Sequence, residues 1–323
     1  VKDERWKYTN LSRLQKIRFR QSLKEDGKLL SKNDLGNLRT NLSCENQVVF
    51  VNGIIRQDLG NISAESQGLV IKRFCETMEK DSSLLDDALK NGGCRRFVTL
   101  NNAAFDDGLF IQVDNAFLEE ITLLLQFVGA ANSPVVRAPR IVVAAKKNAK
   151  LTLIEQFSSY GKDSGLTNAV SQIFAAEGAQ VQYHRIQEEA QTATHIANVS
   201  AHLEKGAEFH CNSVVFGGDL TRIDIDVDLK GKKANCHLNG LYVGNNTQHI
   251  DHHTTVNHIV GDTHSTEFYR GILGDGSRGV FNGRVVVDKK AQKITASQVN
   301  NNLLLSSKAE IDTKPELEIY ADD

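Results

Sequence analysis

Hydrophobic residues in the last two-thirds of the chain fall in short runs separated by polar turns. From residue 96 onward these runs follow one another at a spacing of roughly ten residues, and only residues 168–176 predict a short helix. Many short strands without long helices between them predict an all-β repeat, sandwich or barrel.

The clearest alternation runs from Ile223 to Leu229 and places aliphatic residues on one face of a strand. The opposite face carries Asp224, Asp226 and Asp228, a row of carboxylates that could hold a hard cation such as calcium. Side chains on one face of a single strand do not converge on one point, so we expect these aspartates to form a solvated outer face.

One stretch of the chain is echoed about one long coil later. Residues 206–211 (GAEFHC) resemble residues 233–238 (KANCHL), which indicates degenerate coils that share only their inward positions. Cys211 and Cys236 would then stack in adjacent turns as small buried hydrophobic side chains.

The end of the chain carries apolar runs that need neighbours above and below them, namely Val285–Val287, Leu303–Leu305 and Leu317–Ile319. We therefore predict a mainly β fold, a right-handed parallel β-helix, with an antiparallel sandwich as the alternative. Asn300, Asn301 and Asn302 suit a corner, where amides bond their equivalents in the next coil. Leu304→Asp is expected to unfold the last coils.

The first part of the chain predicts a small mixed, mostly helical domain over residues 1–95, followed by the β-helix core over 96–323. One helix would be capped by Thr9 or Asn10, a second would carry Val70, Phe74 and Met78, and a third would be capped by Ser82 or Ser83. Between these helices, Gln47–Ile55 predicts a strand that turns at Asn52–Gly53.

Composition narrows the class of protein. The 323 residues have a formal net charge of -2, which gives no global field for nucleic acid or an anionic membrane. No apolar segment reaches the roughly 18 residues that a membrane span needs. Five widely spaced cysteines, an odd number, favour a reducing cytoplasm over a disulfide framework. The chain starts with Val1 rather than methionine, and we expect it to be a fragment trimmed at both ends.

The densest group of potential ligands lies between His249 and His258. His249, Asp251 and His253 would share one face of a strand and are weak candidates for binding iron, zinc or copper. Alternate residues on a strand are nearly 7 Å apart, which favours hydrogen-bonded histidines instead. Residues 274–279 have dinucleotide-loop spacing but precede a strand rather than a helix. We predict no catalytic or cofactor-binding residues.

Several segments near the end of the chain resemble the core of the SufB/SufD family of iron-sulfur cluster assembly proteins. The resemblance is carried by Val280–Gly283, Ala291–Gln292, Gln298, Asn302–Leu305 and Thr313–Asp323. The opening Trp6–Thr9 is similar to the SufD branch. Gln298–Asn302 lacks the cysteine that the SufB branch is expected to carry there, which also favours SufD.

The resemblance implies a non-catalytic subunit of a SufB–SufC–SufD complex that pairs with a SufB-like scaffold chain and assists iron entry. It implies contact with a SufC-like ATPase through a C-terminal helical domain that is absent here. The chain alone would hold no cofactor, although iron or an iron-sulfur cluster could be bound in the complex. The expected interface residues are Asn300, Asn301, Asn302, Tyr320 and Asp322. An isolated chain could form a homodimer, and no nucleic acid or membrane partner is expected.

Three other functions remain open from the residues themselves. One is a SufB-type cluster scaffold. Another is a carbohydrate-active β-helix enzyme that uses Asp224, Asp226 and Asp228. The third is a homomeric structural protein.

Overall fold

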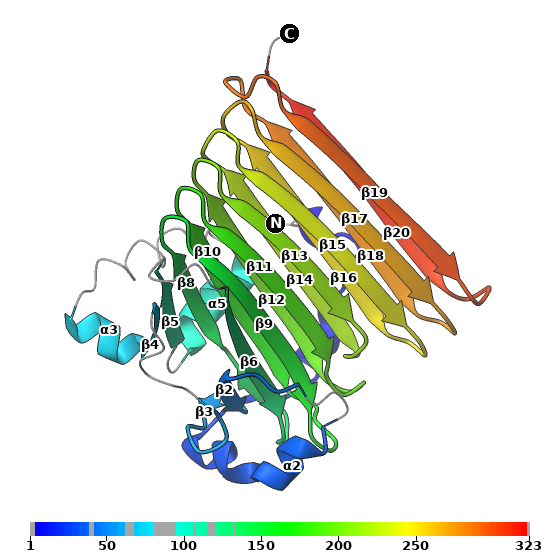
Figure 1. Cartoon of the computed structure of the whole chain (residues 1–323). Coiled ribbons are helices and arrows are strands. Elements are labelled where there is room, and N and C mark those ends of the chain that lie inside the picture. Colours follow the sequence, from blue (N-terminus) through cyan, green and yellow to red (C-terminus); the bar gives the residue numbers. More distant parts are fainter. Residues whose placement is uncertain are drawn as a thin grey trace.

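The computed structural model describes residues 4–38, 42–61, 68–80, 95–105, 108–114, 120–131 and 133–321. Its main body is a parallel β-helix in which each coil gives one strand to each of two facing sheets (Figure 1). This arrangement confirms the predicted fold class and rules out the antiparallel sandwich.

The first sheet, called sheet A, has the order β20-β18-β16-β14-β12-β10-β8-β5-β4, with β7 and β1 beside this path. All of its pairs are parallel except β4 with β5. Its strands are β1 (Arg20–Gln21), β4 (Leu69–Arg73), β5 (Gly108–Val113), β7 (Val135–Arg137), β8 (Arg140–Ala145), β10 (Leu166–Ala175), β12 (Thr194–Leu203), β14 (Leu220–Leu229), β16 (His249–His258), β18 (Arg278–Val287) and β20 (Glu310–Ile319).

The second sheet, called sheet B, has the order β19-β17-β15-β13-β11-β9-β6-β2-β3. Among its described strands, only β2 and β3 pair antiparallel. Its strands are β2 (Asn46–Val51), β3 (Ile54–Ile55), β6 (Ile121–Gly129), β9 (Lys150–Ser159), β11 (Gln180–Glu188), β13 (Glu208–Val215), β15 (Asn235–Gly244), β17 (His264–Leu273) and β19 (Thr295–Leu304).

The hydrophobic core lies between the two sheets because alternate residues of each strand point inward. Ala197 pairs with Ile223 on the next coil, and both belong to the main buried cluster. Phe50, Phe127 and Phe157 stack in successive coils with ring centroids 4.7 and 4.6 Å apart. Such ladders make each coil a cover for the one before it.

The corners of the coils follow the echo seen in the sequence. Gly206 and Lys233 occupy equivalent corners, and both have positive φ, at 66° and 62°. The echoed residues pair one to one, so Cys211 lies beside Leu238 and Cys236 beside Phe209. Both thiols are buried as predicted. The expectation that they stack on each other is wrong, because Cys236 pairs with the residue two positions before Cys211.

The N-terminal region is mixed and small. Its described helices are the 3₁₀ helices η1 (Glu4–Trp6) and η2 (Lys24–Leu29) and the α-helices α1 (Ser12–Gln15), α2 (Lys32–Gly36), α3 (Phe74–Lys80) and α5 (Arg96–Ala104). The predicted hairpin is confirmed, because β2 and β3 turn at Asn52 and Gly53. The pattern at Val70, Phe74 and Met78 is divided between β4 and α3, so the single helix predicted there is wrong. The helix capped by Ser82 or Ser83 lies outside the described residues.

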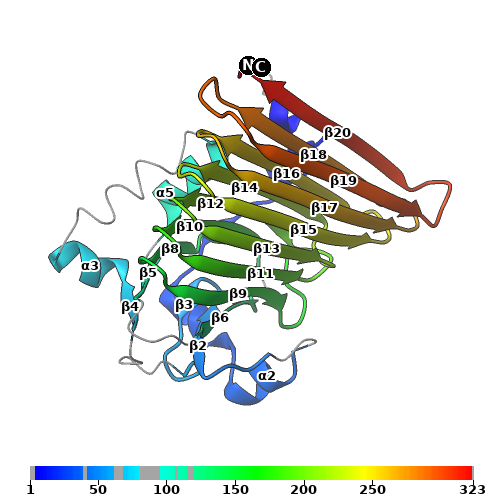
Figure 2. The same cartoon turned by 45° about the horizontal axis from the view of Figure 1, so that its top comes forward.

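Helix α5 and the N-terminal segment cover the outer face of sheet A (Figures 1 and 2). The Asn101 side chain of α5 donates hydrogen bonds to the carbonyl oxygens of Pro139 and Asn168, at 3.1 and 2.8 Å. This cover explains why β10 is buried on both faces. The helix predicted over residues 168–176 is therefore wrong, because ladder pairing with β8 and β12 outweighs the local pattern.

The last apolar runs differ from the prediction. Val285 and Val287 are buried, whereas Leu303, Leu304, Leu305, Leu317 and Ile319 are exposed. No described strand covers these residues, so Leu304→Asp would not create a buried charge and the expectation of unfolding is withdrawn. No helix among the described residues is long and apolar enough to cross a membrane.

Candidate functional site: the open end of the β-helix

Strand β19 ends sheet B and is paired on one side only. The backbone N–H of Thr295 donates to the carbonyl oxygen of Thr263, just before β17, and the N–H of Leu305 donates to the carbonyl oxygen of Leu273, the last residue of β17. Successive residues of a paired strand alternate their N–H directions. The N–H groups of the residues at 296, 298, 300, 302 and 304 therefore point to the free edge, where a further strand can pair.

Strand β20 ends sheet A, and its free edge is interrupted. Glu310, its first residue, and Tyr320, which follows its last residue, donate backbone hydrogen bonds to the carbonyl oxygens of Ser277 and Val287. The odd-numbered residues therefore face the free edge, and one of them is Pro315, which has no N–H. A strand that adds to β20 meets a gap at this position, whereas β19 contains no proline.

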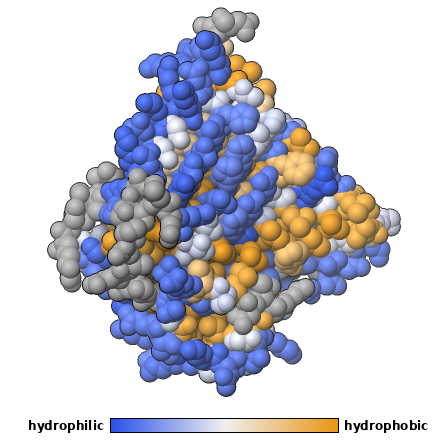
Figure 3. All heavy atoms as spheres, viewed as in Figure 1, coloured by the Kyte–Doolittle hydropathy of each residue, from blue (hydrophilic) through white to orange (hydrophobic). Residues whose placement is uncertain are grey.

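The end of the coil also presents uncovered apolar side chains. Leu303, Leu317 and Ile319 are 56, 63 and 61% exposed. A cavity of about 450 Å³ lies between β19 and β20, with Val285, Ala296 and Leu317 among its lining residues. Figure 3 shows hydrophobic residues gathered at the right of the molecule, where β19 ends. Unpaired edges next to apolar surface are typical of a site where another chain adds.

The asparagines expected at a corner lie within β19 instead. Asn302 accepts a hydrogen bond from the hydroxyl of Tyr242 at 2.5 Å, and Asn300 donates to that hydroxyl at 3.2 Å. The Asn302 amide also donates to the Asn300 side chain. Asn301 faces outward and is exposed. The corner assignment is therefore wrong, and an amide network crosses the mouth of the open end.

The other predicted interface residues lie near the end of β20. Tyr320 is exposed, and its hydroxyl donates to Glu318 at 3.0 Å, which raises the pKa of the phenol. Glu318 in turn accepts two hydrogen bonds from the Arg284 guanidinium, at 2.9 and 2.6 Å, and these lower its pKa. Asp322 lies outside the described residues. Whether these residues form an interface stays a prediction.

The structure brings His249, Asp251 and His253 together on the outer face of sheet A. Asp251 accepts a hydrogen bond from Arg222 at 2.8 Å, and His253 Nε2 lies 2.9 Å from its other oxygen. Thr9, from the N-terminal segment, bonds both His249 and Asp251. Burial works against the charge of Asp251, but Arg222 and His253 hold its pKa well below the usual range. In the described chain no three or more His, Cys, Asp or Glu residues are grouped so that they could hold a metal ion.

The aspartate row on β14 is only partly solvated, because Asp224 is buried whereas the Asp226 and Asp228 side chains are 28 and 25% exposed. Arg222 contacts Asp224 at 2.9 Å, and Arg95 contacts both Asp224 and Asp226. Burial raises the pKa of Asp226 to about 6. Asp228 bonds His202 and Asn257. Arg95, which lies just before α5, and Trp6 partly cover this face. The centre of the Trp6 ring is 4.0 Å from the guanidinium carbon of Arg222.

A buried polar network inside the coil was missed by sequence reasoning. Glu155 accepts hydrogen bonds from Ser171 (2.6 Å), Tyr183 (2.6 Å) and Arg185 (2.7 Å). His195 bonds Glu189 at 2.6 Å, and burial lowers the pKa of this imidazole. The sequence signal for this network is a set of charged residues at inward positions of strands. Those positions can be recognised only when the pairing register of the strands is known.

The buried cysteines lack the character of nucleophiles. Burial raises the pKa of the Cys211 thiol to about 12, and it raises the pKa of Cys236 well above its ordinary value. Thiolates are the reactive and metal-binding form of cysteine. These side chains are therefore suited to packing, as the sequence predicted.

Comparisons with known proteins identify the family of this chain. Residues 127–323, more than half of the chain, match the family model described as "SUF system FeS cluster assembly, SufBD core domain". The chain belongs to the SufBD family. The SufBD match includes all strands from β7 to β20 and therefore the whole of the open end.

Individual SufBD relatives differ in how much of their length is matched. An iron-sulfur cluster assembly SufBD family protein of Synechocystis sp. is 28% identical over 99% of this chain and 73% of its own length. The iron-sulfur cluster assembly protein SufD of Escherichia coli is 33% identical over 55% of this chain and 42% of its own length. SufD of Plasmodium falciparum is 27% identical over 57% of this chain, which is 13% of that protein.

Proposed function

We propose that this SufBD-family chain acts as a SufD-type, non-catalytic subunit that pairs with a SufB-like chain through its open end. The observation that carries the proposal is the combination of two free strand edges with exposed leucines on β19 and β20. Backbone hydrogen bonds at the edges would fix the orientation of the partner strand, and burial of the leucines would supply binding free energy.

Two features favour a partner role over a SufB-type scaffold. The stretch Gln298–Asn302 has no cysteine, and it forms an amide network with Tyr242 rather than a thiolate site. Cys211 is buried with a pKa of about 12. In this proposal iron or an iron-sulfur cluster is cargo that is held together with the partner, this chain assists its entry, and ATP is used by a SufC-like subunit. The complex would work in the cytoplasm.

The pairing of the aspartates argues against the carbohydrate-active alternative. Asp224 and Asp226 contact Arg95, and Asp228 contacts His202, so these carboxylates already have basic partners. Incubation of the purified chain with acidic polysaccharides should release no reducing sugar. Turnover of such a substrate would support the enzyme class instead.

Co-expression with a SufB-like chain and a SufC-like ATPase tests the proposal. Co-elution and light scattering should give a complex that contains both SufB-like and SufD-type chains. The double variant L303D/L317D should abolish co-elution while leaving the fold intact, since both residues are exposed. L29D, an exposed leucine on η2 away from the open end, is the matched control and should bind normally. Equal binding by both variants would contradict the proposal.

A further inference from the structure

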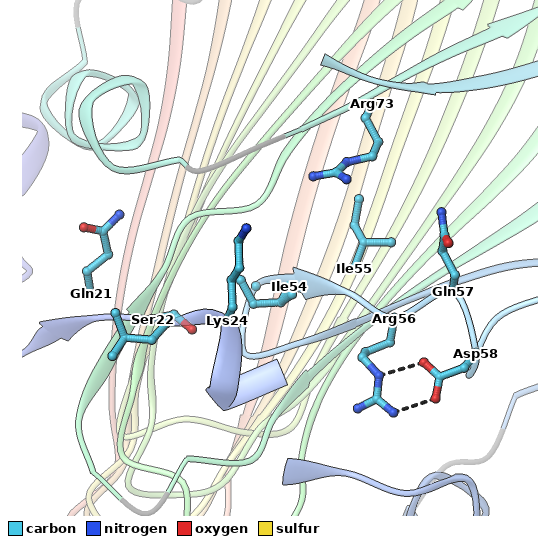
Figure 4. A pocket seen from close by; sticks show the side chains of 11 residues that line it. Gln21, Ser22, Lys24, Ile54, Ile55, Arg56, Gln57, Asp58 and Arg73 are labelled. Atoms are coloured by element: carbon cyan, nitrogen blue, oxygen red, sulfur yellow. Dashed lines mark hydrogen bonds and ion pairs between the residues drawn. The ribbon is translucent and has the colours of Figure 1, made fainter. Parts of the chain in front are cut away.

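Cavities lie at both ends of the β-helix. The cleft beside β3 and η2 has a volume of about 950 Å³, and two of its charged residues, Arg56 and Asp58, are joined by two hydrogen bonds (Figure 4). The cavity at the open end has a volume of about 450 Å³ and lies between β19 and β20. The outer edges of these two strands have no partner strand among the described residues. A strand that adds to the open end would therefore cover this second cavity.

Three amide side chains form one wall of the open end, which we call the amide wall. Gln298, Asn300 and Asn302 lie at alternate positions of β19, so they share one face of the strand. This face points into the coil, because Asn302 contacts the hydroxyl of Tyr242, a residue of the buried core. The opposite wall, on β20, carries the exposed apolar side chain of Leu317. The open end therefore has a polar wall and an apolar wall.

Two side chains of the amide wall belong to a closed ring of hydrogen bonds. The Tyr242 hydroxyl donates to Asn302 Oδ1 at 2.5 Å, and the Asn302 amide donates to Asn300 Oδ1 at 2.5 Å. The Asn300 amide donates back to the Tyr242 oxygen at 3.2 Å. Each member donates to one neighbour and accepts from the other, so the ring fixes the orientation of both amides.

The ring reaches across a whole coil because β17 carries a glycine at the position between. Gly271 pairs with Tyr242 on one side and with Asn302 on the other. A Cβ atom at Gly271 would overlap both the Tyr242 ring and the Asn302 side chain. The amide wall is therefore held from inside the core, and its polar atoms are in place before a partner arrives.

The ring does not use all the hydrogen-bonding groups of its asparagines. A side-chain amide has two N–H groups and an oxygen with two acceptor sites, and Asn302 uses one N–H and one acceptor site in the ring. A strand that pairs with β19 places alternate side chains directly beside the amide wall, because paired residues of neighbouring strands point to the same face. An aliphatic side chain there would remove the amides from water without replacing their hydrogen bonds, which costs free energy.

We propose that Asn300 and Asn302 select the partner strand: the chain that adds to β19 carries hydrogen-bonding side chains at the two positions beside them. The inference rests on the proposed function, because it requires a SufB-like chain to pair along β19. Recognition would then combine amide or hydroxyl side chains of the partner beside β19 with apolar side chains beside Leu317. A strand with aliphatic side chains at all of its inward positions would bind more weakly.

Calorimetry with the full chain and a purified SufB-like chain tests the proposal. N300L and N302L should each weaken binding about tenfold or more, because they leave a hydrogen-bonding group of the partner unpaired. N301L is the matched control, since Asn301 lies between the two on the same strand but is exposed on the opposite face. It should bind within about twofold of the original chain.

The direction of the change separates recognition from simple solvation of the end. If the amides served only to keep an uncovered end in contact with water, N302L would bind as tightly as the original chain or more tightly, because the partner would bury its leucine. Such a result would overturn the proposal, and so would a loss in N301L equal to that in N302L.

Thermal melts of N300L and N302L should match that of N301L, which shows that lost binding is not unfolding. Where N302L alone melts early, Y242F/N302L removes the hydroxyl that the leucine leaves unpaired and gives the same comparison. Pairing that survives N302L but is abolished by L303D/L317D would overturn this proposal and leave the proposed function standing. No pairing by the original chain would contradict both.

Discussion

The two ends of the β-helix differ in whether other elements cover them. At the first end, the edge strand β3 has two residues and runs antiparallel to β2. Residues of η2 and α2 cover this end, where Leu30 and Leu35 are buried in a cluster with Val49 and Val51. At the last end, β19 and β20 each present ten residues with a free edge.

This difference shows that the apolar pattern of a coil does not by itself decide whether a residue is buried. Leu30 and Leu35 are covered by neighbouring elements, whereas Leu317 is exposed because no described element lies beyond it. A long uncovered edge is a liability unless another chain occupies it. The closed end therefore contributes to stability, and at the open end the edges of β19 and β20 carry no partner strand among the described residues.

The largest expected effect compares a covered leucine with an exposed one. Leu153→Asp places a carboxylate in the core, where Leu153 is fully buried, and should cost more than about 4 kcal/mol of stability. Leu303→Asp at the open end should change stability by less than about 0.5 kcal/mol. Thermal melts followed by circular dichroism measure both. Similar losses in the two variants would mean that the ends do not differ in packing.

A smaller contrast compares ion pairs. Arg185→Met leaves Glu155 buried without its cation and should cost about 3–5 kcal/mol. Arg284→Met removes the partly exposed pair with Glu318 near the open end and should cost about 1 kcal/mol or less. Urea unfolding of the two variants gives the comparison. A larger loss for Arg284→Met would reverse the roles assigned to the interior and the end.

The pH dependence of stability gives a third contrast. Burial raises the pKa of Glu267 from 4.5 to about 7. Its protonated form is therefore favoured in the folded chain, so its contribution is fully present below pH 4.5 and is lost as pH rises to about 7. Glu267→Gln removes this loss and should stabilise the chain by about 3 kcal/mol at pH 8. At pH 4 the two chains should melt alike, and an equal gain at both pH values would disprove the cause.

The smallest expected effect concerns the interrupted edge of β20. Pro315→Ala restores one N–H to this edge, which adds about 1 kcal/mol to pairing with a partner strand. Binding to a SufB-like chain should tighten by less than about tenfold. Calorimetry measures the affinity of the variant and of the original chain for the SufB-like chain. No change would indicate that the partner strand pairs along β19 alone.

The parallel β-helix was predictable because its signals are local. The alternation from Ile223 to Leu229 and the echo between residues 206–211 and 233–238 both reflect inward positions of single strands. The segment 168–176 misled because its alanines and spacing suit a helix, whereas pairing with neighbouring coils decides its structure. The local pattern therefore predicted the fold class more reliably than it predicted the type of each element.

The candidate site was harder to predict because it depends on what lies next to each residue. Leu317 pairs with the buried Val285 but is exposed because no described strand follows it, which hydrophobicity alone does not reveal. The contacts of Asp224 depend on Arg95 and Arg222, and the Asp251 site depends on Thr9, some 242 residues away. Interactions between such distant segments require the coil register.

Hydrogen exchange in a complex with a SufB-like chain shows whether β19 is the edge that pairs with the partner. Amide exchange is measured on the chain alone and on the chain bound to a SufB-like partner. We expect slowed exchange at residues 295–304 of β19, with weaker protection along 311–319 of β20 because Pro315 interrupts that edge. Protection confined to the covered first end, or no protection on binding, would contradict the account.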